Sequence, residues 1–113
     1  MNMNADNHRL DRVTDGLLQI ELELRQLQLW ELSPPPESAL QSREPFCLDT
    51  MAFTQWLQFV FLPKMKLLVE AAQPLPSVSG IAPMAEEYFR GREQSGQGLV
   101  KALEEMDRLL SGS

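Results

Sequence analysis

The sequence is poor in the residues that carry most metal-binding and catalytic chemistry. Its 113 residues include one histidine, one cysteine and one tyrosine. A structural zinc site needs about four cysteine or histidine ligands, and a disulfide within the chain needs two cysteines. Both are therefore excluded. We predict that the chain has no metal site, no cofactor and no catalytic residues, and that it is not an enzyme.

Signals for export and for membrane insertion are also missing. Residues 1–7 lack the basic and apolar regions of a signal peptide. The longest apolar stretch, residues 56–62, falls far short of the roughly 20 residues that a membrane helix needs. A lone thiol fits a reducing compartment. We therefore expect a cytoplasmic protein that binds no membrane.

Basic residues are outnumbered. Sixteen acidic and ten basic residues give a net charge of −6, which disfavours direct binding to nucleic acid. The excess is concentrated in residues 1–56, with nine acids and four bases. One interpretation is an acidic docking surface for a basic protein partner, and the other is a solvated face that keeps the protein soluble.

The first long segment has the periodicity of an amphipathic helix. Six apolar residues are spaced 3, 4, 3, 4 and 3 apart: Leu10, Val13, Leu17, Ile20, Leu24 and Leu27. This spacing predicts a helix from about Asp6 to Trp30, with Asp6 and Asn7 as caps. Three further leucines, Leu18, Leu22 and Leu29, widen the apolar face. Packing inside a bundle and a dimeric coiled coil both remain open.

Proline marks the next boundaries. Residues 33–36 (SPPP) end the first helix, and residues 33–46 form a loop. Asp49 is expected to cap a second helix over about residues 51–72. That helix is apolar nearly all round, which predicts the central element of a bundle. Pro63 either kinks it or splits it in two.

Two more helices complete the prediction. A short one runs from Pro83 to about Phe89, and a last one runs from a Ser95 cap to about Leu110. The last helix has an apolar stripe at Leu99, Leu103, Met106 and Leu110. The fold class is therefore all-α, a small four-helix bundle of three long helices plus one short helix. Residues 1–113 form one domain, with residues 1–6 and 111–113 frayed.

Few residues qualify as catalytic groups. His8 lies close to the fraying N-terminus and is interpreted as a surface residue. Cys47 precedes a helix N-terminus, where the dipole lowers a thiol pKa. No base lies near it in the sequence, however, and the residues on either side of it are apolar. We interpret it as a buried, inert thiol, with a reactive thiol as the alternative. Glu86 and Glu87 are adjacent on a helix, point about 100° apart and are interpreted as solvated acids. Residues 94–98 lack the full phosphate-loop pattern.

Two stretches resemble a known family. Residues 45–63 (PFCLDTMAFTQWLQFVFLP) resemble the signature segment of the YqcC-like (DUF446) family, and residues 81–89 (IAPMAEEYF) resemble its second signature. The similarity runs from about Leu10 onward. The resemblance implies a small bacterial protein with an all-helical bundle fold and no established biochemical activity. Genes of this family commonly lie beside a tRNA pseudouridine synthase gene, which implies an accessory role.

The sequence and the resemblance together predict a non-catalytic interaction or accessory protein, a regulator of a tRNA pseudouridine synthase. Its partner would be a protein, a basic RNA-modifying enzyme, and the chain itself would be a monomer or a homodimer. The candidate interaction surface comprises nine residues: Glu21, Glu23, Glu31, Gln55, Trp56, Gln58, Glu86, Glu87 and Tyr88. The alternative is a small-molecule-binding bundle with a pocket lined by Trp56, Tyr88 and Phe89.

Overall fold

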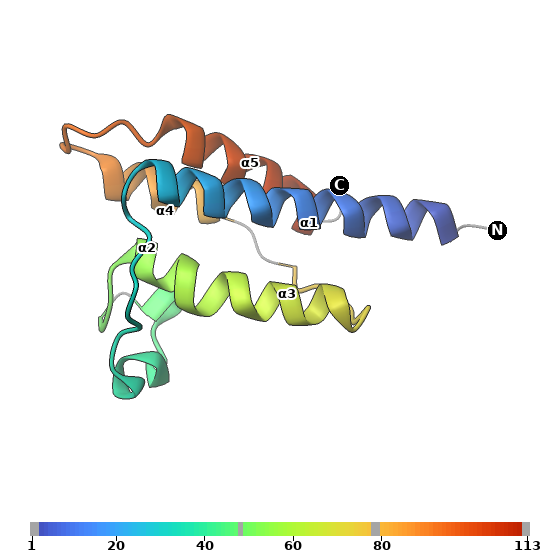
Figure 1. Cartoon of the computed structure of the whole chain (residues 1–113), viewed down its shortest axis with the longest axis horizontal. Helices are drawn as coiled ribbons and strands as arrows, with labels where there is room; N and C mark the ends of the chain where they lie inside the picture. Colours follow the sequence, from blue (N-terminus) through green and yellow to red (C-terminus); the bar gives the residue numbers. More distant parts are fainter. Residues whose placement is uncertain (1–2, 48, 78–79, 112–113) are drawn as a thin grey trace.

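A computed structural model describes residues 3–47, 49–77 and 80–111, and within these ranges the chain forms helices and no strand (Figure 1). The elements in chain order are α1 (Met3–Gln26), the 3₁₀ helices η1 (Glu37–Gln41) and η2 (Pro45–Cys47), α2 (Phe53–Trp56), the π turn η3 (Leu57–Phe61), α3 (Leu62–Glu70), α4 (Ile81–Phe89) and α5 (Gln97–Leu110). The segments α2, η3 and α3 follow one another without a gap, so they act as one long helix. The predicted all-α bundle of three long helices and a short one is confirmed.

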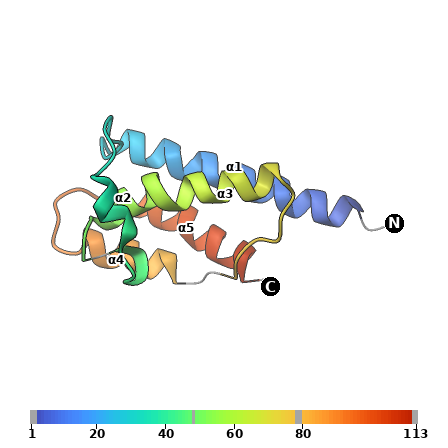
Figure 2. The same ribbon diagram turned by 90° about the horizontal axis from the view of Figure 1, so that it is seen from below.

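The helices form a ring. α1 packs against α5 and α3, α5 packs against α4, and α4 packs against α2 (Figures 1 and 2). The second long helix is therefore one side of the ring, and the expectation that it is central was wrong. Its outer surface is exposed at Lys64 and Leu67, which marks the side facing away from the core.

The apolar stripes of α1 and α5 meet in the core. The α1 stripe is fully buried at its middle four positions, and all four stripe residues of α5 are buried. Gly16 leaves room for the end of the Met106 side chain, because a Cβ there would lie 2.8 Å from Met106 Cε. The predicted widening of the α1 stripe is wrong for Leu18 and Leu22, which are exposed, whereas Leu29 packs against the core.

α1 ends earlier than expected, at Gln26 instead of Trp30. The chain leaves the helix through Gln28, whose φ is +60°. The backbone N–H of Leu29 donates to Leu24 and that of Gln28 donates to Arg25, which is the Schellman pattern of helix termination. Because α1 begins at Met3, Asp6 and Asn7 lie within the helix and are not its caps.

The second long helix begins at Phe53, and Asp49 is not its cap. The Asp49 carboxylate instead accepts a hydrogen bond from Ser42. Ala52 precedes the helix, and its backbone N–H donates a hydrogen bond to the Gln55 side chain at 2.8 Å. Downstream, the Leu62 N–H donates to Leu57 five residues back, so a π turn directly precedes Pro63. The helix is thus locally widened and not split.

The starts of α4 and α5 also differ from expectation. α4 begins at Ile81, two residues before Pro83, after Gly80 with a φ of +86°. Gly80 offers no side chain as a cap; the Asp107 carboxylate of α5 accepts hydrogen bonds from the first two N–H groups of α4 instead. α5 begins at Gln97 with Gly96 as the N-cap residue, so Ser95 is not the cap. Residues 112 and 113, in the segment predicted to be frayed, lie outside the described residues.

The segment predicted as a loop, residues 33–46, contains η1 and most of η2. It covers a small second cluster of buried residues, Ala39, Cys47 and Met51. Thr50 Oγ1 donates to the Ala39 carbonyl at 2.7 Å and closes this cluster. Within the described ranges, no helix is both long enough and apolar enough to cross a bilayer.

Candidate functional site

The structure divides the nine predicted surface residues among three places. Glu21 and Glu23 lie on α1, and Glu86, Glu87 and Tyr88 lie on α4. The remaining four gather where the chain after α1 crosses the start of the second long helix. These four are Glu31, Gln55, Trp56 and Gln58. The nine residues therefore come from three parts of the fold.

Gln58 joins the chain after α1 to the second long helix. Its Oε1 accepts the Glu31 backbone N–H at 2.9 Å, and its Nε2 donates to the Glu31 carbonyl at 2.7 Å. Gln55 Nε2 adds a longer bond of 3.3 Å to the Glu31 carboxylate. Gln58 is buried, at 6% exposure. Its amide therefore serves the fold and is covered, while the Glu31 carboxylate stays exposed beside it.

Trp56 lies half-buried above this junction. Its ring meets Phe46 edge-on with centroids 4.8 Å apart, and it also contacts Phe53 and Phe61. The same ring touches the small cluster around Cys47, so it connects both apolar clusters. Cys47 is buried, and the next α-helix begins only at Phe53. The expectation that Cys47 directly precedes a helix N-terminus was therefore wrong.

Two of the predicted carboxylates on α1 are already engaged within the chain. Glu21 forms ion pairs with Arg25 at 3.0 Å and with Lys66 of α3 at 3.4 Å. Partial burial raises the pKa of Glu21, but hydrogen bonds from Arg25 and Lys66 outweigh it, so its pKa lies below the usual value. Glu23 accepts a hydrogen bond from Gln19 at 2.9 Å and stays partly exposed toward α5.

The α4 candidates combine exposed charge with a covered aromatic ring. Glu86 and Glu87 are exposed, and Glu87 pairs with Arg90 at 3.1 Å. Tyr88 is half-buried, with its ring edge against Phe89. The Arg92 guanidinium lies 4.0 Å above the Tyr88 ring centre, which is a cation–π contact.

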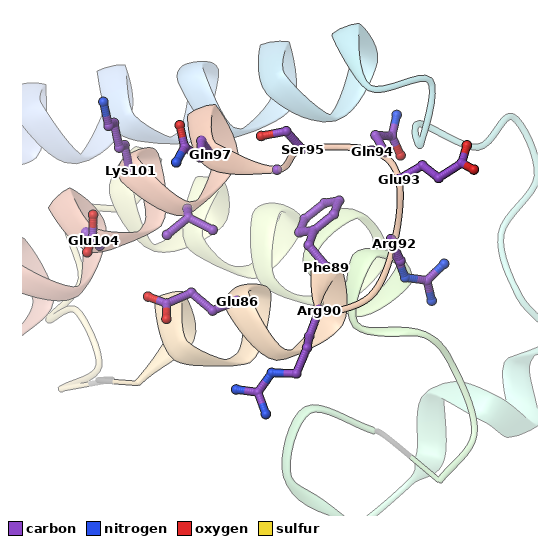
Figure 3. Close-up of a pocket in the computed structure, with 12 residues that line it drawn as sticks. Glu86, Phe89, Arg90, Arg92, Glu93, Gln94, Ser95, Gln97, Lys101 and Glu104 are labelled. Carbon is purple, nitrogen blue, oxygen red and sulfur yellow. The ribbon is translucent and has the colours of Figure 1, made fainter.

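A cavity of about 510 Å³ opens beside the connection between α4 and α5 (Figure 3). Phe89 lies in its middle, with Glu86 and Glu104 at one end and Arg92 at the other. Of the three aromatic residues predicted to line a pocket, only Phe89 does so among the residues around this cavity. Trp56 and Tyr88 lie elsewhere. The lining mixes acids, bases and amides, so it suits a polar or mixed-charge ligand.

Sequence reasoning missed Asp107, which holds α4 onto α5. The missing signal was indirect: a helix that begins Gly-Ile-Ala-Pro has no side chain of its own to accept its first N–H groups. Reasoning from the sequence also missed that Leu18 and Leu22 face solvent. Within the described ranges, no group of three or more His, Cys, Asp and Glu side chains is placed to hold a metal ion.

The helical bundle and its two signature segments place the chain in a family. The model of the family described as "DUF446: tRNA pseudouridine synthase C" matches residues 12–109. The chain belongs to this family, as the resemblance predicted. A solved relative shares the fold: the solution NMR structure of the protein YqcC from E. coli superimposes with a TM-score of 0.78 at 33% identity, covering 91% of this chain and 88% of that one.

Two further relatives differ from each other in length. An uncharacterized protein of Haemophilus influenzae is 40% identical over 92 residues, which cover 80% of this chain and 87% of the relative. A protein of Pectobacterium carotovorum named "tRNA pseudouridine synthase C" is 38% identical over 86 residues. Those residues cover 76% of this chain but only 23% of that longer protein.

Proposed function

We propose that this chain is a non-catalytic interaction protein that associates with a tRNA pseudouridine synthase and regulates it. The observation behind this proposal is the difference in length between its relatives. In Haemophilus influenzae the similar region makes up most of a small protein. In Pectobacterium carotovorum it makes up less than a quarter of a long protein named after the synthase.

The physical reasoning concerns effective concentration. Two domains in one polypeptide meet at an effective concentration near millimolar, whatever their affinity. When the same domain is made separately, surface complementarity has to replace the covalent linker. A small chain that works beside a synthase therefore needs an exposed recognition surface, and it needs no catalytic group of its own.

The candidate recognition surface comprises the accessible acidic residues of α1 and of the segment that follows it. Glu31 is exposed in that segment, and Glu23 is partly exposed on α1. Glu21 contributes less, because Arg25 and Lys66 already neutralise it. An enzyme that binds tRNA presents basic surface to it. The acidic residues of this chain would meet such a surface and control access of tRNA, and the chain would not bind tRNA itself.

The test is a binding titration between the purified chain and the synthase of the same organism, at low salt and at about 0.15 M salt. We expect binding that weakens as salt rises. The variant Glu23→Lys/Glu31→Lys should bind about tenfold more weakly. The matched control is Glu70→Lys/Glu104→Lys, which makes the same change in net charge at exposed acids of α3 and α5 outside the predicted surface and should bind like the wild type. Absence of binding, or direct micromolar binding of tRNA by the isolated chain, would contradict the proposal.

The second candidate function is small-molecule binding in the α4–α5 cavity, and its volume favours it. About 510 Å³ falls within the 300–1,000 Å³ typical of ligand pockets. A screen of zwitterionic metabolites by thermal shift would test it. A ligand that belongs in this cavity should lose its stabilising effect in Glu104→Ala, whereas Glu70→Ala on α3 is a control outside the cavity.

A further inference from the structure

The outer face of α1 has a second periodic stripe, separate from the one in the core. Residues 11, 15, 18, 22 and 25 are spaced 4, 3, 4 and 3 apart, so they lie along one side of the helix. They are Asp11, Asp15, Leu18, Leu22 and Arg25, and we call them the outer stripe. All five are exposed. The outer stripe lies on the part of α1 that stays exposed while α3 and α5 cover its core stripe.

Its two leucines expose unusual apolar area for a helix this acidic. Leu18 is 58% exposed and Leu22 is 46% exposed, one turn apart. Beside Leu18 a hollow of about 90 Å³ opens between α1 and α3, with Leu17 and Val69 in its lining. An apolar side chain from another molecule could enter this hollow and contact Leu18. This would be knobs-into-holes packing, in which a side chain of one helix fits between residues of another.

Charge along the outer stripe changes sign. Two acids, Asp11 and Asp15, lie toward the N-terminus, and Arg25 lies toward the C-terminus. Neither carboxylate has a hydrogen bond or an ion pair within the described part of the chain. Arg25 uses its Nε to reach Glu21, and its guanidinium lies 4.5 Å above the Trp30 ring. Its Nη groups are left to donate to a further carboxylate.

This order of charges is complementary to itself when reversed. If two copies of α1 lie antiparallel with Leu18 on the two-fold axis, Asp11 of each copy faces Arg25 of the other. Leu18 then meets its own counterpart, and Leu22 packs next to Asp15 and Leu18 of the second copy. A parallel arrangement would place Asp11 against Asp11 and Arg25 against Arg25, which is repulsive. A two-fold axis produces a closed pair and no filament.

We propose that the outer stripe is a homodimer interface in which two copies of this chain pair antiparallel through α1. The occupant of this face is a second copy of the same chain. The contact spans about four turns of helix with two leucines from each side, so it is smaller than the interfaces of permanent dimers. The dimer therefore forms reversibly with concentration. This proposal is independent of the proposed function, since Glu23 and Glu31 are not part of the outer stripe.

Sedimentation velocity on the full chain tests the proposal, from low micromolar concentration to about 0.5 mM in about 0.15 M salt. The wild type should shift from the monomer mass of 12.8 kDa toward twice that value. Leu18→Glu/Leu22→Glu should remain a monomer throughout. Leu67→Glu is the matched control, because Leu67 is 67% exposed on α3 and lies outside the outer stripe. Circular dichroism confirms that each variant is folded.

Charge exchange tests the antiparallel direction. Asp11→Arg and Arg25→Glu should each weaken dimerisation about tenfold, since each places like charges opposite one another. The double variant Asp11→Arg/Arg25→Glu restores opposite charges across the antiparallel pair and should dimerise like the wild type. A wild type that stays monomeric at the highest concentration overturns the proposal. So does a dimer that survives in the leucine variant, or a double variant that associates no better than the single ones.

Discussion

The carboxylate of Asp107 holds the first backbone amide of α4, with Oδ1 lying 3.1 Å from the nitrogen of Ile81. Its other oxygen, Oδ2, accepts the N–H of Ala82 at 2.9 Å. Asp107 lies on α5, whereas both amides belong to α4. One side chain therefore caps α4 and also fixes its position against α5. A negative charge at a helix N-terminus also interacts favourably with the helix dipole.

We expect Asp107→Ala to lower the free energy of unfolding by about 1–2 kcal/mol, because two amides lose their acceptor. Urea denaturation followed by circular dichroism measures the loss. Asp15→Ala is the control, since Asp15 is exposed on α1 and should change stability little. Hydrogen exchange at Ile81 and Ala82 should accelerate in the Asp107 variant. An unchanged exchange rate at these two amides would contradict the role of Asp107 as a cap.

Gln58 should matter more for stability than its neighbour Gln55. Replacing Gln58 by Ala leaves the Glu31 backbone N–H and carbonyl without their partner and should cost about 1–3 kcal/mol. Gln55→Ala removes bonds at a less buried position and should cost about 1 kcal/mol or less. Denaturant titration of both variants separates the two. Equal losses would show that the buried amide of Gln58 has no special role.

Ala72 is a site where glycine should stabilise the chain. Its φ is +52°, and its N–H donates to Val69 in the same terminating pattern as Gln28. A side chain in this left-handed conformation costs about 1–2 kcal/mol, so Ala72→Gly should raise the free energy of unfolding by about 1 kcal/mol. Ala71→Gly is the matched control; Ala71 has a φ of −87°, so glycine there should be neutral or destabilising. A melting temperature that falls in Ala72→Gly would refute the assignment.

Glu21 should contribute a pH-dependent part of the stability. Because its pKa in the folded chain lies below the ordinary 4.5, its contribution is fully present above pH 4.5. The contribution is lost as the pH falls through the lower pKa of the folded state. Glu21→Gln should therefore be less stable than the wild type near pH 7, and the two should converge as the pH falls below the lowered pKa of the folded state. Stability curves for the two proteins from neutral to acidic pH measure this, and a constant difference would argue against it.

The Cys47 thiol should react slowly in the folded chain, because it is 7% exposed. Labelling with a thiol reagent should be on the order of a hundredfold slower than in denaturant, since it requires local opening. A suitable comparison is Leu67→Cys in a Cys47→Ser background, which carries one exposed thiol on α3. Cys47→Ser itself should cost only modest stability. Rapid stoichiometric labelling of native Cys47 would instead favour a reactive thiol.

Apolar periodicity predicted the interior of this fold well. The stripe from Leu99 to Leu110 is buried at all four positions. Residues at this spacing lie on one face of a helix, and that face packs into the core. The same spacing on α1 located its core residues. It failed for Leu18 and Leu22, since periodicity does not say how many neighbours a helix has. Their burial depends on where α3 and α5 lie, which is a property of the whole bundle.

Helix ends were harder to predict, because they depend on partners distant in sequence or on rare backbone conformations. Asp49 and Ser95 are good caps by residue type, yet the Asp49 carboxylate bonds to Ser42 and α5 starts beyond Ser95. Gln28 and Ala72 adopt positive φ where glycine would be the expected residue. Of the candidate site, the sequence predicted exposed acids such as Glu31 and Glu86, but it did not indicate that Gln58 is buried.

The packing of α1 against α5 also determines how late α1 gains its native neighbour during translation. About 70 residues separate the two helices, so at about 5–20 residues per second the ribosome completes α5 several seconds after α1. Through that interval, the side of α1 that faces α5 has no native neighbour and its apolar side chains stay uncovered. Arg9 likewise waits for the Leu109 carbonyl, to which it bonds at 2.8 Å once both helices are present. The nascent chain therefore carries an exposed amphipathic helix until nearly all of the bundle has been translated.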